Sequence, residues 1–464
     1  MSIATYCQCT FQKAQFLLIY QYVINQLRTI TPKPVLDAYH WLISRISALF
    51  YGFPSSKLVV IGVTGTNGKS TVVNFIGRIL EANGSKVGWT TTANMKIADK
   101  EWLNDTKMTM LGRFQLQRLL RKMVKSGCRY AVIETSSQGI IQHRHKEINY
   151  DTVVFTNLTP EHIEAHGGFE NYKKAKLELF RHLSAKRKKI INGAVVPKRM
   201  VVNISDEHCA DFLLFPADEK FGFGIDGRIN SEAGAQAKRI IASGISMSEQ
   251  GSEFNALGER FKIKIPGAHN IENALAAIAV GYSEGIAIEK LGEYSSSLRG
   301  VPGRMEFVDE GQNFSVLIDY APEPASFARL YEAIPLFAHN RVIHVLGSAG
   351  GGRDSARREV LGRMAGAKAD VVIVTNEDPY DEDPAKIIDE VSAGAVAVGK
   401  REGAGLFKIL DRKQAIARAF ALAKEGDLVV ITGKGCEQAI VVGGRKKIKW
   451  DDRVVARELL KNLN

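Results

Sequence analysis

The chain has 464 residues, of which 45% are apolar and 24% are charged. That composition is close to the average for folded soluble proteins, so it excludes a disordered, a collagen-like and a multi-span membrane protein. The length predicts about three domains at roughly 150 residues each. Lysine and arginine outnumber aspartate and glutamate by 62 to 50. The resulting formal charge of +12 favours anionic partners such as nucleotides, phosphorylated sugars, nucleic acid or an acidic membrane surface.

The first 57 residues differ from the rest of the chain. They hold five basic side chains and one acidic one, a net +4 by subtraction, and two apolar segments at 14–27 and 35–53. The second segment contains an aspartate, a histidine and an arginine, which argue against a lipid-spanning helix. Its apolar residues recur at three- and four-residue steps and predict an amphipathic helix. That helix either packs on the next domain or lies on a membrane surface.

Neither the N-terminus nor the cysteines indicate secretion. No small-residue cleavage site follows the first apolar stretch, as a signal peptide would require. The five cysteines are too few and too scattered for a disulfide framework. We therefore expect a reducing, cytoplasmic setting.

Beyond residue 57 the pattern changes to strands that alternate with helices. The continuous apolar run 58–63 predicts a buried parallel strand, and 72–82 predicts the helix that follows it. Alternation of this kind is typical of α/β sheets. Further strands are expected at 130–133, 152–155, 342–346, 371–375 and 428–432.

A glycine-rich turn with a lysine joins the first strand to its helix. Glycines let backbone N–H groups turn towards a phosphate, and the helix N-terminus adds positive potential. Lys69 can reach the β- and γ-phosphates of a nucleotide, and Ser70 or Thr71 can ligate Mg²⁺. The turn is a variant P-loop, because Val63 stands where a glycine is usual. The expected phosphate-binding residues are Gly65, Thr66, Asn67, Gly68, Lys69, Ser70 and Thr71.

The predicted fold class is therefore α/β. We expect a short helical N-terminal region (1–57), a central P-loop domain with a mostly parallel sheet (58–300) and a Rossmann-like α/β C-terminal domain (301–464).

Polar side chains follow two further strands of the central region. Glu134 directly follows strand 130–133, and His162 lies beyond strand 152–155. The carboxyl ends of parallel strands face the ligand crevice, so both could hold Mg²⁺. Helix capping by Glu134 or by the serines that follow it, and a structural role for His162, fit the pattern about as well. Downstream, Lys173, Lys174 and Lys176 are expected to line a solvated helix face.

Two features of the last region leave alternatives open. A second glycine-rich turn at 347–354 is either a ligand loop or a flexible connector, because no lysine–serine pair accompanies it. The run 376–383 carries five acids in eight residues. Such a run is usually solvated, yet at the end of a strand it could also receive a cationic amine.

Together these motifs resemble the Mur ligases, in particular the branch that adds the third residue of the peptidoglycan stem peptide. The resemblance runs from about Leu58 to the C-terminus. Its most specific pieces are Gly65-Thr66-Asn67-Gly68-Lys69-Ser70, Glu134-Thr135-Ser136-Ser137 continuing to Gln142-His143-Arg144, Phe155-Thr156-Asn157-Leu158, His269-Asn270, Gly433-Lys434-Gly435 and Trp450-Asp451-Asp452-Arg453.

The resemblance implies a central domain that binds ATP and a last domain that carries the incoming amino acid. It also implies a reaction in two steps. The carboxylate of a muramoyl peptide attacks the γ-phosphate to form an acyl phosphate, and the amine of the added amino acid then displaces phosphate. In-line phosphoryl transfer needs mainly positioning and charge neutralisation, which fits a P-loop with metal ligands.

Site residues carry over by position. The resemblance implies that Lys69 and its loop hold the ATP phosphates, that Ser70, Glu134 and His162 ligate magnesium, and that Lys176 is carbamylated and helps to place the metal. Asn270, Arg304 and Asp319 would meet the nucleotide. The implied muramoyl-peptide contacts are Thr109, Ser136, Gln142 and Arg144, and the implied amino-acid contacts are Asp378, Tyr380, Gly433 and Glu437.

Three departures from the family pattern matter. Only 57 residues precede the P-loop region, where the branch has a whole domain for the uridine nucleotide. Members that add meso-diaminopimelate carry Asp-Asn-Pro-Arg, but here Tyr380 replaces the arginine and cannot form a bidentate ion pair. Acids without that arginine would suit an amino acid ending in a bare ammonium, such as lysine. In addition, Pro322 and Gln138 replace usual histidines near the nucleotide or metal.

The sequence thus predicts a cytoplasmic, monomeric ATP- and Mg²⁺-dependent ligase that adds diaminopimelate or lysine to a muramoyl dipeptide. No nucleic-acid partner is expected, while the N-terminal region could contact a membrane. The alternatives are a ligase of the folylpolyglutamate or cyanophycin type and a non-catalytic nucleotide-binding partner subunit.

Overall fold

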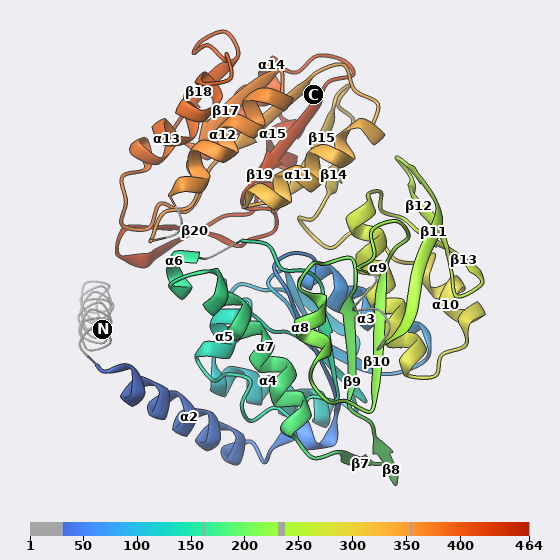
Figure 1. The fold of residues 1–464 in the computed structure, drawn as a ribbon. Helices are drawn as coiled ribbons and strands as arrows, with labels where there is room; N and C mark the ends of the chain where they lie inside the picture. The colour runs from blue at the N-terminus through green and yellow to red at the C-terminus, as the bar shows by residue number, and fades with distance from the viewer. Residues whose placement is uncertain (1–30, 161–162, 231–236, 353–354, 464) are drawn as a thin grey trace, which may run out of the picture.

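The computed structural model describes residues 31–160, 163–230, 237–352 and 355–463. Within these residues an 11-stranded sheet and a six-stranded sheet form two α/β domains, which lie one above the other in Figure 1. We refer to them as the large-sheet domain and the C-terminal sheet domain. This arrangement confirms the predicted α/β fold.

The large sheet has the order β13-β12-β11-β10-β9-β6-β1-β5-β2-β3-β4. Its centre, from β11 to β2, is parallel, while β12–β13 and β3–β4 are added antiparallel at the two edges. β1 therefore lies in the middle, where both faces are buried. The strands are β1 (Val59–Thr64), β2 (Val87–Thr90), β3 (Asn94–Ile97), β4 (Lys100–Leu103), β5 (Tyr130–Glu134), β6 (Thr152–Phe155), β9 (Arg199–Asn203), β10 (Glu219–Ile225), β11 (Lys238–Ser248), β12 (Gly251–Ala256) and β13 (Glu259–Ile263).

Helices cover both faces of this sheet. α3, α9 and α10 pack on one face around a core that includes Trp89 and Phe75, and α4, α7 and α8 pack on the other around Phe155 and Phe180. A small hairpin, β7 (Lys189–Ile191) with β8 (Ala194–Val196), extends from the domain. The helices are α3 (Lys69–Ala82), α4 (Arg113–Lys125), α5 (Ser137–Ile141), α6 (Ile163–His166), α7 (Phe169–Ala185), α8 (Cys209–Leu213), α9 (Ala268–Ser283) and α10 (Ile288–Ser295).

The C-terminal sheet has the order β14-β15-β19-β16-β17-β18 and is parallel except for β14. α11, α12 and α13 cover one face, and α14 and α15 cover the other. A separate hairpin, β20–β21, lies beside the large-sheet domain. The elements are β14 (Glu306–Val308), β15 (Ser315–Asp319), α11 (Pro324–Ala333), β16 (Val342–Leu346), α12 (Ala356–Lys368), β17 (Val371–Thr375), α13 (Pro384–Val396), β18 (Leu406–Ile409), α14 (Arg412–Leu422), β19 (Leu428–Thr432), β20 (Ala439–Val442), β21 (Lys446–Lys449) and α15 (Asp452–Lys461).

The predicted amphipathic helix is α2 (Lys33–Phe50), but it packs by a different face from the one its apolar stripe suggests. Its buried residues are small: Ser44, Ser47 and Ala48. The Ser44 hydroxyl donates to the His143 carbonyl oxygen at 2.6 Å. The exposed side chains include Val35, Tyr39, Trp41, Leu42, Ile46, Leu49 and Phe50. The helix does pack on the large-sheet domain, one of the two predicted alternatives, but small residues make the buried contact while most of the apolar stripe is exposed.

The apolar segment 14–27 of the N-terminal region lies outside the described residues, as do two of the five cysteines, Cys7 and Cys9. The described cysteines are buried and free of disulfides. Among the described residues no helix combines the length and the apolarity that a membrane crossing requires.

His344 generates a prediction about pH and stability. It is fully buried in β16, with Nδ1 2.6 Å from the Tyr331 hydroxyl and Nε2 2.9 Å from the Thr432 hydroxyl. Burial, assisted by the charge of Arg412, lowers the pKa of His344 from 6.5 to about 3. Between these two values the unfolded chain binds a proton that the native imidazole does not, so the free energy of unfolding falls as the pH falls.

We therefore expect this histidine to remove about 2 kcal/mol of stability between pH 7 and pH 5. Urea unfolding of the wild type and His344→Gln at both pH values measures the effect. The variant should show a shallower pH dependence, and identical pH dependence in the two proteins would contradict the prediction.

Candidate active site

The glycine-rich turn lies between β1 and α3 and has backbone geometry that glycine tolerates best. Gly65 has a φ of 151° and Gly68 a φ of 83°. A Cβ at Gly65 would lie 1.9 Å from the Thr156 hydroxyl, and one at Gly68 would lie 2.3 Å from the Asn273 side-chain oxygen. Because α3 begins at Lys69, the N–H groups of its first turn are directed towards this loop. The helix therefore starts three residues earlier than the apolar pattern predicts.

The chain following β6 holds the turn in place. The Thr66 N–H donates to the Asn157 carbonyl at 2.8 Å, and the Asn67 N–H donates to Asn157 Oδ1 at 2.9 Å. The Thr156 hydroxyl donates to the Asn67 carbonyl at 2.7 Å. Lys69 Nζ folds back to the Thr66 carbonyl at 2.7 Å. Two neighbouring strand ends thus build one rigid loop with an ammonium group beside it.

Glu134, at the end of β5, is 2% exposed and accepts hydrogen bonds from two segments. Ser70 Oγ and the Thr92 N–H each donate to Oε2 at 2.7 Å. The Thr92 hydroxyl lies 3.1 Å from Oε1 and 3.1 Å from the Thr109 hydroxyl. A carboxylate among hydroxyls offers the oxygen donors that Mg²⁺ prefers. This donor set fits a magnesium ion that is also bound by phosphate oxygens.

The helix-capping alternative is confirmed for one of the serines that follow Glu134 and not for Glu134 itself. Ser136 is the N-cap of α5, and its hydroxyl accepts the Gly139 N–H at 3.2 Å. The second predicted metal ligand, His162, lies outside the described residues. Within the described part of the chain no three histidine, cysteine, aspartate or glutamate side chains form a metal-ligand group.

Lys176 corrects the prediction of a solvated lysine face. Its side chain, on α7, is 1% exposed. Nζ donates to the Gly65 carbonyl at 2.6 Å and lies 4.3 Å from the centre of the Tyr172 ring. Lys174 on the same helix is exposed as expected. Helical spacing places Lys176 on the buried side of α7, facing the P-loop.

These groups line a single pocket between the two domains. It is walled by the P-loop, by strand ends of the large sheet and by the first residues after β15. The members are Gly65, Thr66, Asn67, Gly68, Lys69, Ser70, Thr71, Thr92, Thr109, Glu134, Ser136, Ser137, Gln138, Tyr172, Lys176, Arg304, Tyr320 and Pro322.

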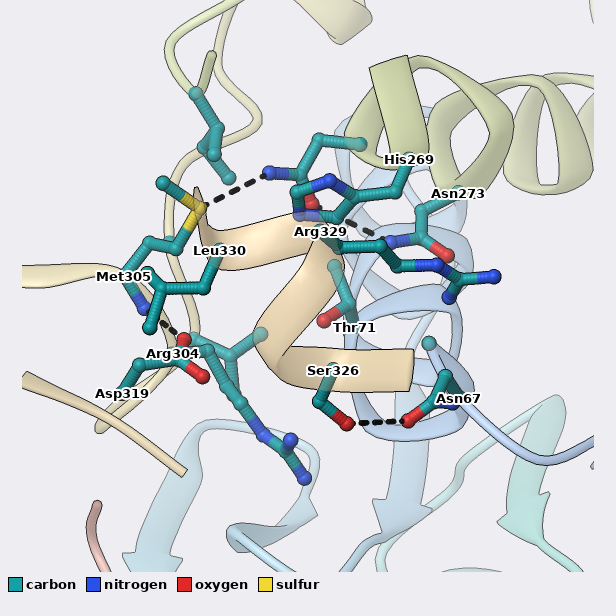
Figure 2. Close-up of a pocket in the computed structure, with 15 residues that line it drawn as sticks. Asn67, Thr71, His269, Asn273, Arg304, Met305, Asp319, Ser326, Arg329 and Leu330 are labelled. Atoms are coloured by element: carbon teal, nitrogen blue, oxygen red, sulfur yellow. Dashed lines mark hydrogen bonds between the residues drawn. The ribbon is translucent and has the colours of Figure 1, made fainter. Parts of the chain in front are cut away.

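A second pocket adjoins the first, since Arg304, Asn67, Gly68 and Thr71 line both. In Figure 2 His269 and Asn273 enter it from α9, and Met305, Asp319 and Ser326 enter it from the C-terminal sheet domain. The Ser326 hydroxyl donates to Asn67 Oδ1 at 3.0 Å across the domain interface. The predicted nucleotide residues Asn270, Arg304 and Asp319 all line this pocket.

Asp319 is held in place by the backbone. Its two carboxylate oxygens accept the Met305 N–H at 2.7 Å and the Ala321 N–H at 2.8 Å. Burial raises the pKa of Asp319, while the charge of Arg304 opposes that shift. Arg304 itself stacks on Tyr320, with Cζ 4.3 Å from the ring centre. The arginine therefore extends from the second pocket towards the first, as Figure 2 illustrates.

Gln142 and Arg144, the other predicted muramoyl-peptide residues, pair with each other. Arg144 donates to Gln142 Oε1 through Nη2 at 2.6 Å and Nε at 3.1 Å, and also donates to the Met110 carbonyl. They do not line the two pockets, unlike Thr109 and Ser136. Met110 follows Thr109 directly, so the pair supports the loop that carries this threonine.

The acidic run after β17 is only partly solvated. Asp381 and Asp383 are exposed, but Glu377 and Asp378 are 4% and 3% exposed. The solvated interpretation is therefore wrong for these two residues. Asp378 Oδ1 accepts Lys434 Nζ at 2.9 Å and the Val441 N–H at 2.7 Å.

The remaining predicted amino-acid residues surround Asp378. Glu437 Oε2 accepts the same Lys434 Nζ at 2.5 Å. The Tyr380 N–H donates to the Val441 carbonyl at 3.1 Å. Gly433 has a φ of 103°, and a Cβ there would lie 2.4 Å from Glu377 Oε2. The glycine therefore allows the buried carboxylate to approach the backbone.

Sequence reasoning missed Thr92 and Lys107. Lys107 Nζ donates to Asp378 Oδ2 at 2.7 Å and lies 3.2 Å from Glu437 Oε2. The two members of the shorter contact are 271 positions apart in the chain. No sequence motif includes Lys107. Its position two residues before Thr109, a predicted site residue, was a signal that could have placed it near the site.

The sequence and the fold match known proteins over most of the chain. Residues 63–281 match the Mur ligase middle domain, and 303–435 match the "Mur ligase, glutamate ligase domain". The UDP-N-acetylmuramyl-tripeptide synthetase of Roseiflexus sp. (strain RS-1) is 38% identical over 426 residues, which are 90% of this chain and 81% of that protein.

Solved structures give the same result. A UDP-N-acetylmuramoyl-L-alanyl-D-glutamate–2,6-diaminopimelate ligase is 27% identical, with a TM-score of 0.56 over 88% of this chain and 79% of that one. The folylpolyglutamate synthase of Mycobacterium tuberculosis, solved with ADP and AMPPCP, is 15% identical, with a TM-score of 0.63 over 91% of this chain and 95% of that one. At that identity the second comparison shows a shared fold alone.

A P-loop that faces a second α/β domain across two adjoining pockets defines a two-domain nucleotide-binding protein. The matches to both Mur ligase domains, together with 38% identity to the Roseiflexus protein over 90% of this chain, show to which family the protein belongs. The chain belongs to the Mur ligase family, and the resemblance seen in the sequence is confirmed.

The geometry of the turn predicts the effect of adding one methyl group. Gly68→Ala should weaken ATP binding at least about tenfold, because the new Cβ would displace Asn273, which lines the second pocket. Gly84→Ala is a matched control, since Gly84 has a similar φ of 79° with no atom within 4 Å of its Cβ position. Titration with a fluorescent ATP analogue measures both, and equal weakening would mean that backbone strain alone is responsible.

Proposed function

We propose that this chain is an ATP-dependent ligase that adds an amino acid, diaminopimelate or lysine, to a muramoyl dipeptide during peptidoglycan synthesis. The observation that carries the proposal is the pair of adjoining pockets, in which the P-loop, Glu134 and Lys176 face Arg304 and Asp319. The names of the Roseiflexus synthetase and of the solved diaminopimelate ligase support the same substrate class.

ATP would bind across both pockets. The second pocket, with Asn270 and Asp319, would take the adenosine, and the P-loop with Lys69 would take the phosphates. Arg304 reaches both pockets, so its guanidinium can approach the phosphates while Asp319 stays near the nucleoside. Positive groups placed in this way neutralise the charge of the transferring phosphoryl group.

The chemistry would proceed in two steps. The peptide carboxylate attacks the γ-phosphorus, the bond to the bridging oxygen breaks, and an acyl phosphate and ADP form. The amine of the incoming amino acid then attacks the acyl carbon, phosphate leaves with the electron pair of the broken C–O bond, and the proton that the amine loses goes to the departing phosphate. Thr109 and Ser136, which line the first pocket, would orient the peptide, with Gln142 and Arg144 supporting that loop.

Ser70 and Glu134, together with His162, would hold Mg²⁺, which supplies charge neutralisation for the phosphates. Lys176 would be carbamylated, which converts its amine into an anionic oxygen donor. Its burial beside the Gly65 carbonyl, at the wall of the first pocket, supports this assignment, because the amine is shielded from bulk water and lies in the same pocket as Ser70 and Glu134. Asp378, Tyr380, Gly433 and Glu437 would contact the incoming amino acid.

The proposal includes the three-part division at residues 57 and 300, a monomeric state and a cytoplasmic location. The two rival functions remain distinguishable from it. A folylpolyglutamate-type ligase would use a different acceptor, and a non-catalytic partner subunit would not turn over ATP.

Phosphate release from ATP tests the proposed function. Muramoyl dipeptide would be supplied as the UDP-linked, lipid-linked or free form, each with meso-diaminopimelate, L-lysine or no amino acid. We expect release that requires both partners, and a loss of about 100-fold in Lys69→Ala because a charge that stabilises the transition state is removed. Lys174→Ala, on the exposed side of α7, is the control. Stimulation by no pair would overturn the proposal.

The exposed apolar face of α2 supports a contact with an anionic membrane surface. Seven large apolar side chains of this helix are exposed: Val35, Tyr39, Trp41, Leu42, Ile46, Leu49 and Phe50. The segment 1–57 carries a net charge of +4, so charge complementarity favours an anionic lipid surface over a neutral apolar partner.

Co-sedimentation with phosphatidylglycerol-containing vesicles tests this contact on the full chain. The wild type should sediment, and the triple variant Tyr39→Ser, Leu42→Ser, Ile46→Ser should remain in the supernatant, because its apolar contact area is reduced. Equal sedimentation of the two proteins would refute the membrane contact. A wild-type dimer that the triple variant converts to a monomer, without vesicle binding, would instead assign the face to a second copy.

A further inference from the structure

Four charged groups of alternating sign form a cluster that includes Asp378 and Glu437, two residues proposed above to contact the incoming amino acid. Lys434 and Lys107 each contact both Asp378 and Glu437, at distances of 2.5 to 3.2 Å. Three of the four belong to the C-terminal sheet domain, whereas Lys107 comes from the loop that joins β4 to α4. The side-chain exposures of Lys434, Asp378, Lys107 and Glu437 are 0%, 4%, 8% and 13%, so the cluster is largely shielded from water.

The loop around Lys107 is built to present this side chain. Asn104 Oδ1 accepts the Thr106 N–H at 2.9 Å, and Asn104 Nδ2 donates to the Met108 carbonyl at 3.0 Å. Lys107 itself has a φ of 56°, a left-handed conformation that is uncommon for a residue with a side chain. Thr109, two residues further on, lines the first pocket. One short loop thus contacts both proposed substrate sites.

The charges of the cluster cancel. Asp378 and Glu437 contribute two negative charges, and Lys434 and Lys107 contribute two positive ones, so the sum is zero. Although burial opposes ionisation, the two lysines hold the pKa of Asp378 below its usual value. Without Lys107 the same cluster would carry one uncompensated negative charge in a site that is poorly screened.

We propose, on the basis of the function proposed above, that Lys107 determines which amino acid this site accepts. By cancelling the surplus charge of Asp378 and Glu437, it favours an amino acid whose far end carries both an ammonium and a carboxylate over one that ends in a bare ammonium. The acidic run taken alone pointed to lysine. The structure adds the second cation, and the expected preference becomes meso-diaminopimelate.

A bare ammonium would add a third positive charge to a cluster in which each acid already contacts both lysines. Glu437 Oε2 already contacts both lysines, and the Asp378 oxygens accept Lys434, Lys107 and the Val441 N–H. An amino acid whose far end carries both charges would replace the contacts of the cluster in pairs, because its carboxylate would contact Lys107 while its ammonium contacts Glu437. Lys107 therefore supplies a cation at a site where the chain has Tyr380 in place of an arginine.

The test compares kcat/KM for meso-diaminopimelate and L-lysine in four full-length proteins. The wild type should prefer meso-diaminopimelate. Lys107→Met should shift the ratio of the two values towards L-lysine by at least about tenfold, the scale of one charged hydrogen bond. Lys107→Arg, which retains the charge, should keep the wild-type preference.

Lys447→Met is the matched control. Lys447 is an exposed lysine of β21 that donates to the Thr106 carbonyl at 3.1 Å, so it connects the same loop to the same domain without meeting the acids. It should leave the ratio unchanged. A wild type that prefers L-lysine, or a Lys107→Met variant that loses both activities equally, would overturn the inference. Absence of activity with every amino acid in the wild type would instead refute the proposed function.

Discussion

The hydrogen bonds between the glycine-rich turn and the residues that follow β6 are the constraint on which the rest of the site depends. Asn157 accepts the Thr66 and Asn67 N–H groups, and Thr156 donates to Asn67 from the other side. These bonds fix where α3 begins, and hence where Lys69 and Ser70 lie. They also place the Gly65 carbonyl, which is the acceptor for Lys176. A loop fixed in this way needs little reorganisation when a charged substrate arrives.

The two α/β domains lie on opposite sides of this loop, so the site has two walls. The large sheet brings the ends of β1, β5 and β6 together because these strands are adjacent and parallel. The C-terminal sheet domain contributes the opposite wall through residues just before β14, at the end of β15 and on α11. Neither wall alone could surround a nucleotide, so the positioning of the two domains is part of the site.

The sequence predicted the buried parallel strands well, because each is a continuous apolar run. β6, β16, β17 and β19 begin and end at the expected residues. The P-loop, the strand-end position of Glu134 and the family were also visible in the sequence. The edge strands β12 and β13 were not identified, since their apolar runs are short and polar residues interrupt them.

What the sequence could not give is which charges become buried. Lys176 resembles its exposed neighbour Lys174 by composition, and only the packing of α7 against the P-loop separates them. The acids after β17 resemble a solvated run until Lys107 and Lys434 are placed beside them. The sequence did not show that the apolar face of α2 is exposed, because the spacing of apolar residues does not tell which face of a helix packs on the rest of the protein.

The bond between Ser326 and Asn67 has a mechanical consequence when it is considered with the Lys107 cluster. The Ser326–Asn67 bond joins the two domains beside the second pocket. The Lys107–Asp378 bond joins them beside the residues proposed to contact the incoming amino acid. A hinge that opens one end must strain or break the contact at the other, unless it turns about an axis through one of them. Opening of the interface at Ser326 and opening of the interface at Lys107 are therefore coupled by geometry.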